Sequence, residues 1–252
     1  MIYLIFKKEL KSFFYSPLAY VLAGLFSLVM GWIFFNLLYS FVENIQALPK
    51  GPGGGEFQFV NHVVIKLFGN LNFLLLMICP ILTMKLFAEE KKDQSIDIYF
   101  SSPINEWQLV LGKFFASWAM GAFILSTTFV FPVISYMAGV QDQSFSVAGY
   151  VGLLLNLASY LSIGLFASSI TKNQIIAALL SFVIILGFWL VSWIIQLSTN
   201  YFVVEILKQA TMVSHYESFV KGILGTHSLI YYTSFTGFWL YCSKKVLEAR
   251  TW

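Results

Sequence analysis

The sequence is poor in charged residues and in cysteine. Asp, Glu, Lys and Arg make up 11% of its 252 residues, whereas soluble domains average about 25%. This shortage excludes a soluble enzyme and a disordered scaffold. A nucleic-acid-binding protein needs a basic face to meet phosphates, and a formal net charge of +3 does not supply one. The two cysteines, Cys79 and Cys242, stand inside apolar runs, which excludes a disulfide framework or a metal-binding pair.

Motifs for catalysis and for metal or nucleotide binding are also absent from the sequence. It contains no His-Glu-x-x-His and no Gly-x-Ser-x-Gly. The glycine-rich segment 50–56 lacks the Gly-Lys-Ser/Thr that completes a phosphate loop, and the three histidines are scattered. We therefore expect no catalytic residue, no metal site and no cofactor in this chain. His215 is interpreted as a surface histidine with local hydrogen bonds.

Long apolar runs are what the sequence has in abundance. Apolar residues make up 58% of the chain, and six segments contain no Asp, Glu, Lys or Arg: residues 12–42, 67–84, 114–141, 143–171, 173–204 and 222–243. A helix of about 20 apolar residues crosses the hydrocarbon core, where a charge costs about 2.5–3.5 kcal/mol. The sequence thus predicts an all-α polytopic membrane protein in the lipid bilayer. Its six transmembrane helices are expected near residues 18–41, 67–87, 112–137, 147–170, 174–197 and 223–243.

The distribution of Lys and Arg predicts the orientation of these spans. Six spans place both termini on one side, and that side would hold eleven Lys and Arg residues, against four on the other. The positive-inside rule assigns the richer side to the cytoplasm. Both termini are therefore expected to be cytoplasmic.

Residues 1–15 have the pattern of an amphipathic helix lying in the membrane interface. Apolar residues fall on one face and lysines on the other: Tyr3, Phe6, Leu10 and Phe13 against Lys7, Lys8 and Lys11. The chain would then turn into the membrane at Ser16-Pro17. The alternative is a charged leader that only sets the topology.

Residues 88–111 form the longest predicted cytoplasmic loop. A short helix is expected over 88–97, with a solvated face made of Glu89, Glu90, Lys91, Lys92 and Asp93. Ser102 and Pro103 suit the N-cap and first position of the next helix. The alternative is a charge cluster that merely obeys the positive-inside rule.

Residues 198–222 are too charged to span the membrane and too apolar to float free of it. We expect one or two short external helices, with His215 and Glu217 near the turn between them. Glu217 would stay in water, while Phe219 would face the membrane or a partner. A lid that covers the spans and contacts nothing else is the alternative.

The spans lack the carboxylates and arginines that ion-driven carriers place near the membrane midplane. Their polar residues suit helix packing better than substrate contact: Asn36, Asn72, Ser126, Thr127, Thr128, Asn156, Ser159 and Ser162. The energy for any transport would therefore come from another chain.

The order of these parts resembles the membrane subunit of type-2 ABC exporters. The resemblance rests on four short motifs: Ala88-Glu89-Glu90-Lys91, Gln94-Ser95-Ile96, Ser102-Pro103 and Leu111-Gly112-Lys113. Gln94 stands where the family usually has glycine. The segment 214–222, which includes His215, Glu217, Phe219 and Gly222, is similar to the gliding-motility and copper-enzyme-maturation branch.

The resemblance implies how the chain would work. The chain would pair with a second permease protomer, as a homodimer or paired half-transporter, in a bacterial inner membrane. The pair would bind two cytoplasmic ABC ATPase subunits, in which ATP and Mg are expected. The loop would supply a coupling helix that contacts the ATPase, with Ile96, Ile98 and Tyr99 as apolar anchors in a groove. The other coupling residues would be Glu89, Glu90, Lys91, Gln94 and Ser95.

Two outcomes of such coupling stay open at this stage. The complex would either export a hydrophobic or amphipathic substrate or act mechanically on an external partner protein. A self-powered channel or carrier and a non-transporting membrane assembly factor are the competing functions.

Overall fold

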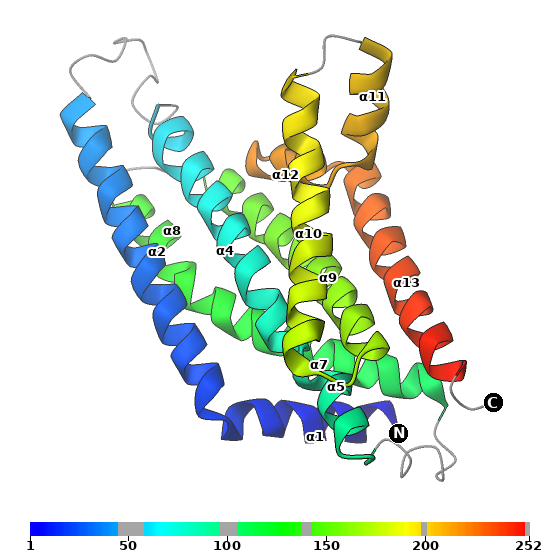
Figure 1. The fold of residues 1–252 in the computed structure, drawn as a ribbon. Helices are drawn as coiled ribbons and strands as arrows, with labels where there is room; N and C mark the ends of the chain where they lie inside the picture. Colours follow the sequence, from blue (N-terminus) through cyan, green and yellow to red (C-terminus); the bar gives the residue numbers. More distant parts are fainter. Residues whose placement is uncertain (45–57, 96–104, 138–142, 198–200, 250–252) are drawn as a thin grey trace.

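The computed structural model describes residues 1–44, 58–95, 105–137, 143–197 and 201–249, and every regular element within them is helical (Figure 1). The α-helices are α1 (Ile2–Tyr15), α2 (Pro17–Asn44), α4 (Ile65–Thr83), α5 (Lys85–Lys92), α7 (Glu106–Ser126), α8 (Val130–Met137), α9 (Ser144–Ile170), α10 (Gln174–Leu197), α11 (Tyr201–Ala210), α12 (Met212–Val220) and α13 (Thr226–Glu248). A π-helical turn, η1 (Val60–Val64), precedes α4, and a 3-10 turn, η2 (Thr127–Phe129), separates α7 from α8.

Five segments of the described chain are long and apolar enough to cross a membrane: Pro17–Glu43, Val60–Lys92, Glu106–Met137, Ser144–Ile170 and Gln174–Ser192. The all-helical, multi-pass architecture predicted from the sequence is thus confirmed. The predicted sixth span, residues 223–243, coincides largely with α13, which is not among the five. Its Thr, Ser, His and Tyr side chains lower its hydropathy.

Helix α9 lies at the centre of the bundle, and α2 and α10 lie at its periphery. The apolar window of α9 is 72% buried within the molecule, against 28% for α2 and 17% for α10. Two glycines of α9 allow neighbouring helices to approach it closely. A side chain at Gly152 would place its Cβ 2.7 Å from Cβ of Phe219 in α12, and one at Gly164 would overlap Thr83 in α4.

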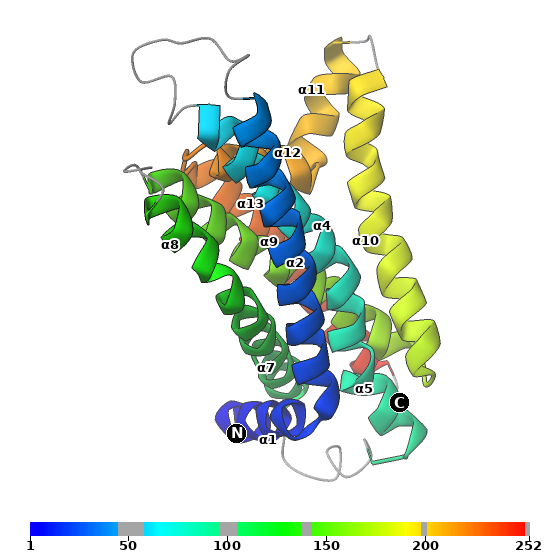
Figure 2. The ribbon, with the colours of Figure 1, turned by 90° about the vertical axis from the view of Figure 1, so that its left-hand side faces the viewer.

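Helix α1 runs across one end of the bundle, at a steep angle to α2 (Figures 1 and 2). Ser16 breaks the two helices apart with an extended backbone (φ −83°, ψ 126°), the conformation that a following proline favours. The turn predicted at Ser16-Pro17 is therefore present. The described part of α13 ends at the same end, here called the α1 end, while α11 and α12 lie toward the opposite, α11 end.

Helix α7 starts later than its sequence suggested. Asn105 is its N-cap, and the side-chain Oδ1 of Asn105 accepts a hydrogen bond from the Trp107 N–H at 3.1 Å. The predicted N-cap role of Ser102 in this helix is wrong, because α7 begins at Glu106 and Asn105 caps it. Ser102 and Pro103 themselves lie outside the described residues.

Polar side chains inside the bundle join helices to one another. Nδ2 of Asn156 in α9 donates to Oδ1 of Asn72 in α4 at 2.6 Å, and the Tyr160 hydroxyl donates to the same oxygen at 3.2 Å. Near η2, Pro132 cannot donate to the Thr128 carbonyl four residues earlier, and the Tyr150 hydroxyl supplies that bond at 2.8 Å. These contacts agree with the packing role expected for the asparagines.

Candidate functional site

Helix α5 continues the direction of the second span but is separated from α4 by a break at Met84. A serine of α9 stabilises this break. Oγ of Ser168 accepts hydrogen bonds from the N–H groups of Phe87 and Ala88, at 3.0 and 3.1 Å, and donates to the Met84 carbonyl at 3.2 Å. Ser168 therefore caps the start of α5 from a neighbouring helix, because the first N–H groups of a helix have no partner within it.

Lys91 fixes the other end of α5 to the same helix. Its side chain is 3% exposed, and its ammonium donates to the carbonyl of Ser169 in the last turn of α9. A lysine there satisfies a terminal carbonyl and complements the negative end of the helix dipole. The expectation that Lys91 belongs to a solvated face is wrong, because α9 covers it.

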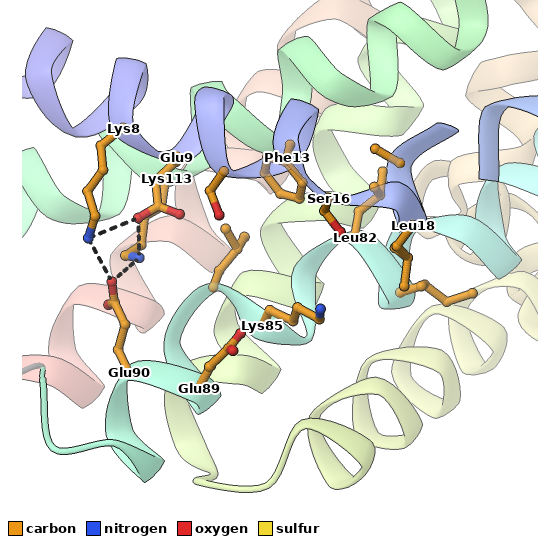
Figure 3. Close-up of a pocket in the computed structure, with 14 residues that line it drawn as sticks. Lys8, Glu9, Phe13, Ser16, Leu18, Leu82, Lys85, Glu89, Glu90 and Lys113 are labelled. Carbon is orange, nitrogen blue, oxygen red and sulfur yellow. Dashed lines mark hydrogen bonds and ion pairs between the residues drawn. The ribbon is translucent and has the colours of Figure 1, made fainter. Parts of the chain in front are cut away.

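Four charged side chains form a cluster that joins three helices at the α1 end (Figure 3). Nζ of Lys113 in α7 lies 2.9 Å from Oε1 of Glu9 in α1 and 2.9 Å from Oε1 of Glu90 in α5. Lys8 lies 4.0 and 3.7 Å from the same two oxygens. The side chain of Lys113 is only 1% exposed. We call Lys8, Glu9, Glu90 and Lys113 the charge cluster.

Gly112 explains how α1 comes close enough to supply Glu9. A Cβ at Gly112 would lie 2.8 Å from Cβ of Ile5, the buried residue of α1, so a larger residue would push α1 away. The Leu-Gly-Lys motif at the start of the third span thus has a physical role in this chain. Its glycine admits α1, and its lysine pairs with α1 and α5.

The exposed residues of α5 and the turn after it are Lys85, Glu89, Lys92, Asp93 and Gln94. Gln94 has φ 55°, the left-handed backbone region in which glycine is favoured. Gln94 stands where the family usually has glycine, and it adopts a backbone conformation that glycine favours. Ser95 is half-buried and donates through Oγ to the Glu90 carbonyl at 3.4 Å. Ile96, Ile98 and Tyr99, the expected apolar anchors, lie outside the described residues.

The external segment is more deeply packed than its sequence suggested. His215 is buried in α12, where its Nε2 lies 3.1 Å from the Gln209 carbonyl and its Nδ1 lies 3.3 Å from the Ser228 hydroxyl. Burial lowers the pKa of His215 below its usual 6.5. His215 does make local hydrogen bonds, but its assignment to the surface is wrong because α13 covers it, with Tyr231 stacked 4.2 Å from its ring.

The remaining residues of this segment divide between buried and exposed positions. Phe219 is fully buried against Gly152, so the expectation that it faces the membrane or a partner is wrong. Glu217 is exposed and forms a loose pair with Lys221 at 3.9 Å. Gly222 ends the segment with φ +80°, and a side chain there would also meet Phe145. Among the described residues, no three His, Cys, Asp or Glu side chains are grouped so as to hold a metal ion.

Comparison with known families decides among the classes of membrane protein. The family model described as ABC-2 family transporter protein matches residues 3–242, which is nearly the whole chain. The chain belongs to the ABC-2 family. No curated protein matches it. This multi-pass ABC-2 permease is thus a membrane component of an ABC transporter.

Sequence reasoning assigned no site role to three residues that position α5 in this ABC-2 permease. Lys113 stands in a recognised motif, but the motif alone does not give its partners. Glu9 is the one carboxylate among the lysines of α1, which is a weak signal for an internal ion pair. Ser168 has no distinguishing signal, because many serines in spans bond only to their own helix.

Proposed function

We propose that this ABC-2 permease couples ATP hydrolysis in a separate ABC ATPase to movement of its membrane helices, and that α5 receives the push. The supporting observation is the attachment of α5. Ser168 and Lys91 join it to α9, and Glu90 joins it to α7 and α1 through Lys113. A displacement of α5 would therefore reach three helices at once.

The ATPase would contact the exposed end of this helix. Lys92, Asp93 and Gln94 are exposed there, whereas Glu90 and Lys91 are held inside the permease. We propose that these three residues, with Ile96, Ile98 and Tyr99 after them, form the docking surface. Glu90 and Lys91 then act as attachments that transmit the displacement rather than as contacts with the ATPase.

The rest of the assembly follows the type-2 ABC exporter pattern. We propose that α13 is a sixth span, that the α1 end faces the cytoplasm of a bacterial inner membrane, and that two protomers bind two ATPase subunits carrying ATP and Mg. The lysine distribution supports this orientation.

The substrate class follows from the interior of the spans. The apolar segments carry no Asp, Glu, Lys or Arg in their central turns. We therefore propose a hydrophobic or amphipathic export substrate. The similarity of segment 214–222 to the gliding-motility and copper-enzyme-maturation branch also favours mechanical action on an external partner, through the exposed parts of α11 and α12.

Affinity purification from mild detergent tests this proposal. The tagged full chain should co-purify with a protein carrying a phosphate-loop motif, and the complex should hydrolyse MgATP. Lys92→Glu should lower recovery of that ATPase, whereas Lys66→Glu, an exposed lysine at the α11 end, should not. Purification of a stable permease with no ATPase in either preparation would contradict the proposal and favour a self-powered channel or an assembly factor.

A further inference from the structure

A cavity of about 270 Å³ opens beside the charge cluster, between α1 and the joint of α4 and α5. Most of its lining comes from two separate stretches, and Lys113 of α7 and residues of α2 and α4 complete it. Lys8, Glu9, Ser12, Phe13 and Ser16 come from α1 and the turn after it, and Lys85, Leu86, Glu89 and Glu90 come from α5. The labelled members of both stretches face one another across it in Figure 3.

The cavity lies at the ends of the spans, at the depth where lipid headgroups stand in a bilayer. Four of its apolar lining residues lie at span ends: Leu18 and Ala19 stand in the first turn of α2, and Ile81 and Leu82 stand in the last turn of α4. Its charged lining residues lie in α1 and α5, beyond those ends, apart from Lys113 near the start of α7. A ligand there would meet hydrocarbon on one side and charges on the other, as a phospholipid does at the bilayer surface.

Two charges of the lining are not used by the charge cluster. Glu9 and Glu90 pair with Lys113, whereas no ion pair joins Lys85 or Glu89 to another described residue. Figure 3 shows Lys85 and Glu89 side by side on α5, apart from the dashed contacts of the cluster. Both are exposed, and they stand four residues apart, about 5–6 Å between Cβ atoms. The cavity therefore offers one ammonium and one carboxylate to a ligand.

We propose that this cavity binds the headgroup of a phosphatidylethanolamine lipid. The Lys85 ammonium donates to the lipid phosphate, and the Glu89 carboxylate accepts from the primary ammonium of the ethanolamine, with Ser12 and Ser16 as hydroxyl partners on the facing wall. The acyl chains leave along Leu18 and Ile81 toward the membrane. The proposal needs neither the ATPase nor a particular orientation of the chain.

Other common headgroups fit these residues less well. Choline has no N–H to donate to Glu89, and quaternary ammonium groups are bound by several aromatic rings, of which this lining has one, Phe13. Phosphatidylglycerol carries a phosphate but no cation for Glu89. Of these three headgroups, only ethanolamine offers both an anionic phosphate to Lys85 and a cationic N–H donor to Glu89.

Native mass spectrometry of the delipidated full chain tests the proposal, with phosphatidylethanolamine, phosphatidylcholine and phosphatidylglycerol of identical acyl chains. Charge-assisted hydrogen bonds predict about tenfold tighter binding of the ethanolamine lipid than of either other lipid. Glu89→Gln should remove this preference, and Lys85→Gln should weaken binding of all three. Lys7→Gln, at an exposed position of α1 outside the cavity, is the matched control and should leave the binding of all three lipids unchanged.

Equal binding of the three lipids by the parent chain would overturn the proposal without any variant. Retention of the preference in Glu89→Gln would overturn it as well. Competition by soluble glycerophosphoethanolamine at concentrations equal to the lipid would assign the cavity to a soluble ligand instead, and would contradict a lipid site.

Discussion

Lys113 carries a buried charge, and burial of an unpaired ammonium in a protein interior costs several kcal/mol. Two carboxylates from different helices, each at 2.9 Å, offset that cost, and the ring of Phe87 lies 5.3 Å from the same nitrogen. The pairing works only while α1, α5 and α7 keep their places. A buried lysine shared by two helices therefore fixes the geometry of the site more than it adds to stability.

The first prediction concerns this lysine. Lys113→Met should destabilise the protein by about 3–5 kcal/mol, because Glu9 and Glu90 would remain beside each other without the cation between them. Thermal unfolding in detergent would show the loss as a lower midpoint. Adding Glu9→Gln and Glu90→Gln should restore most of it. If Lys113→Met unfolds at the same temperature as the exposed control Lys92→Met, the charge cluster has no structural role.

The second prediction concerns the backbone at Gln94. Gln94 adopts the left-handed backbone region, which costs a residue with a side chain about 1–2 kcal/mol of conformational energy. Glycine has no such cost. Gln94→Gly should therefore be neutral or raise the unfolding midpoint. Asp93→Gly, at the neighbouring position with φ −86°, should lower it, because glycine there only adds freedom to the unfolded chain. Equal losses at both positions would contradict the account of this turn.

At the scale of the elements, the attachment of α5 to α9 is the feature on which coupling depends. The third prediction is that Ser168→Ala loosens the start of α5, because Phe87 and Ala88 lose the acceptor of their N–H groups. Two lost hydrogen bonds predict about ten- to a hundredfold faster amide exchange at these positions.

Ser169→Ala is the matched control for this prediction. The Ser169 hydroxyl donates to the Phe166 carbonyl of its own helix at 2.7 Å, so its removal should leave exchange in α5 unchanged. Identical exchange in both variants would show that Ser168 does not cap α5.

The sequence identified the elements of the site better than their contacts. The amphipathic pattern of residues 1–15 and the Ser16-Pro17 turn are local signals, and α1 and its end follow from them. The burial of Lys91 depends on the end of a helix almost 80 residues away in the chain. Local composition makes such a lysine look solvated, because the partner is a backbone carbonyl that any residue could supply.

At the scale of the whole molecule, the charge-free runs predict where the helices lie in the sequence. How deeply each residue is buried depends on contacts between helices that are distant in the chain. The sequence predicts that Phe219 faces the membrane or a partner, because its segment is too charged to span the membrane. The ring of Phe219 instead packs in the interior against Gly152 of α9, where a side chain would leave no room for it. The contacts of the candidate site likewise depend on packing between distant helices. Leu-Gly-Lys was recognised as a motif, while its function as the docking place of α1 required the distance between Gly112 and Ile5.

The central claim is that an ATPase binds at the exposed end of α5, and in-cell photo-crosslinking tests it most directly. A photo-crosslinking amino acid is placed at Asp93 or, as the control at the α11 end, at the exposed Lys208. Position 93 should yield an adduct with a chain that carries a phosphate-loop motif, and position 208 should not. An ATPase adduct at position 208, or its absence at position 93 in a normally expressed protein, would contradict the account.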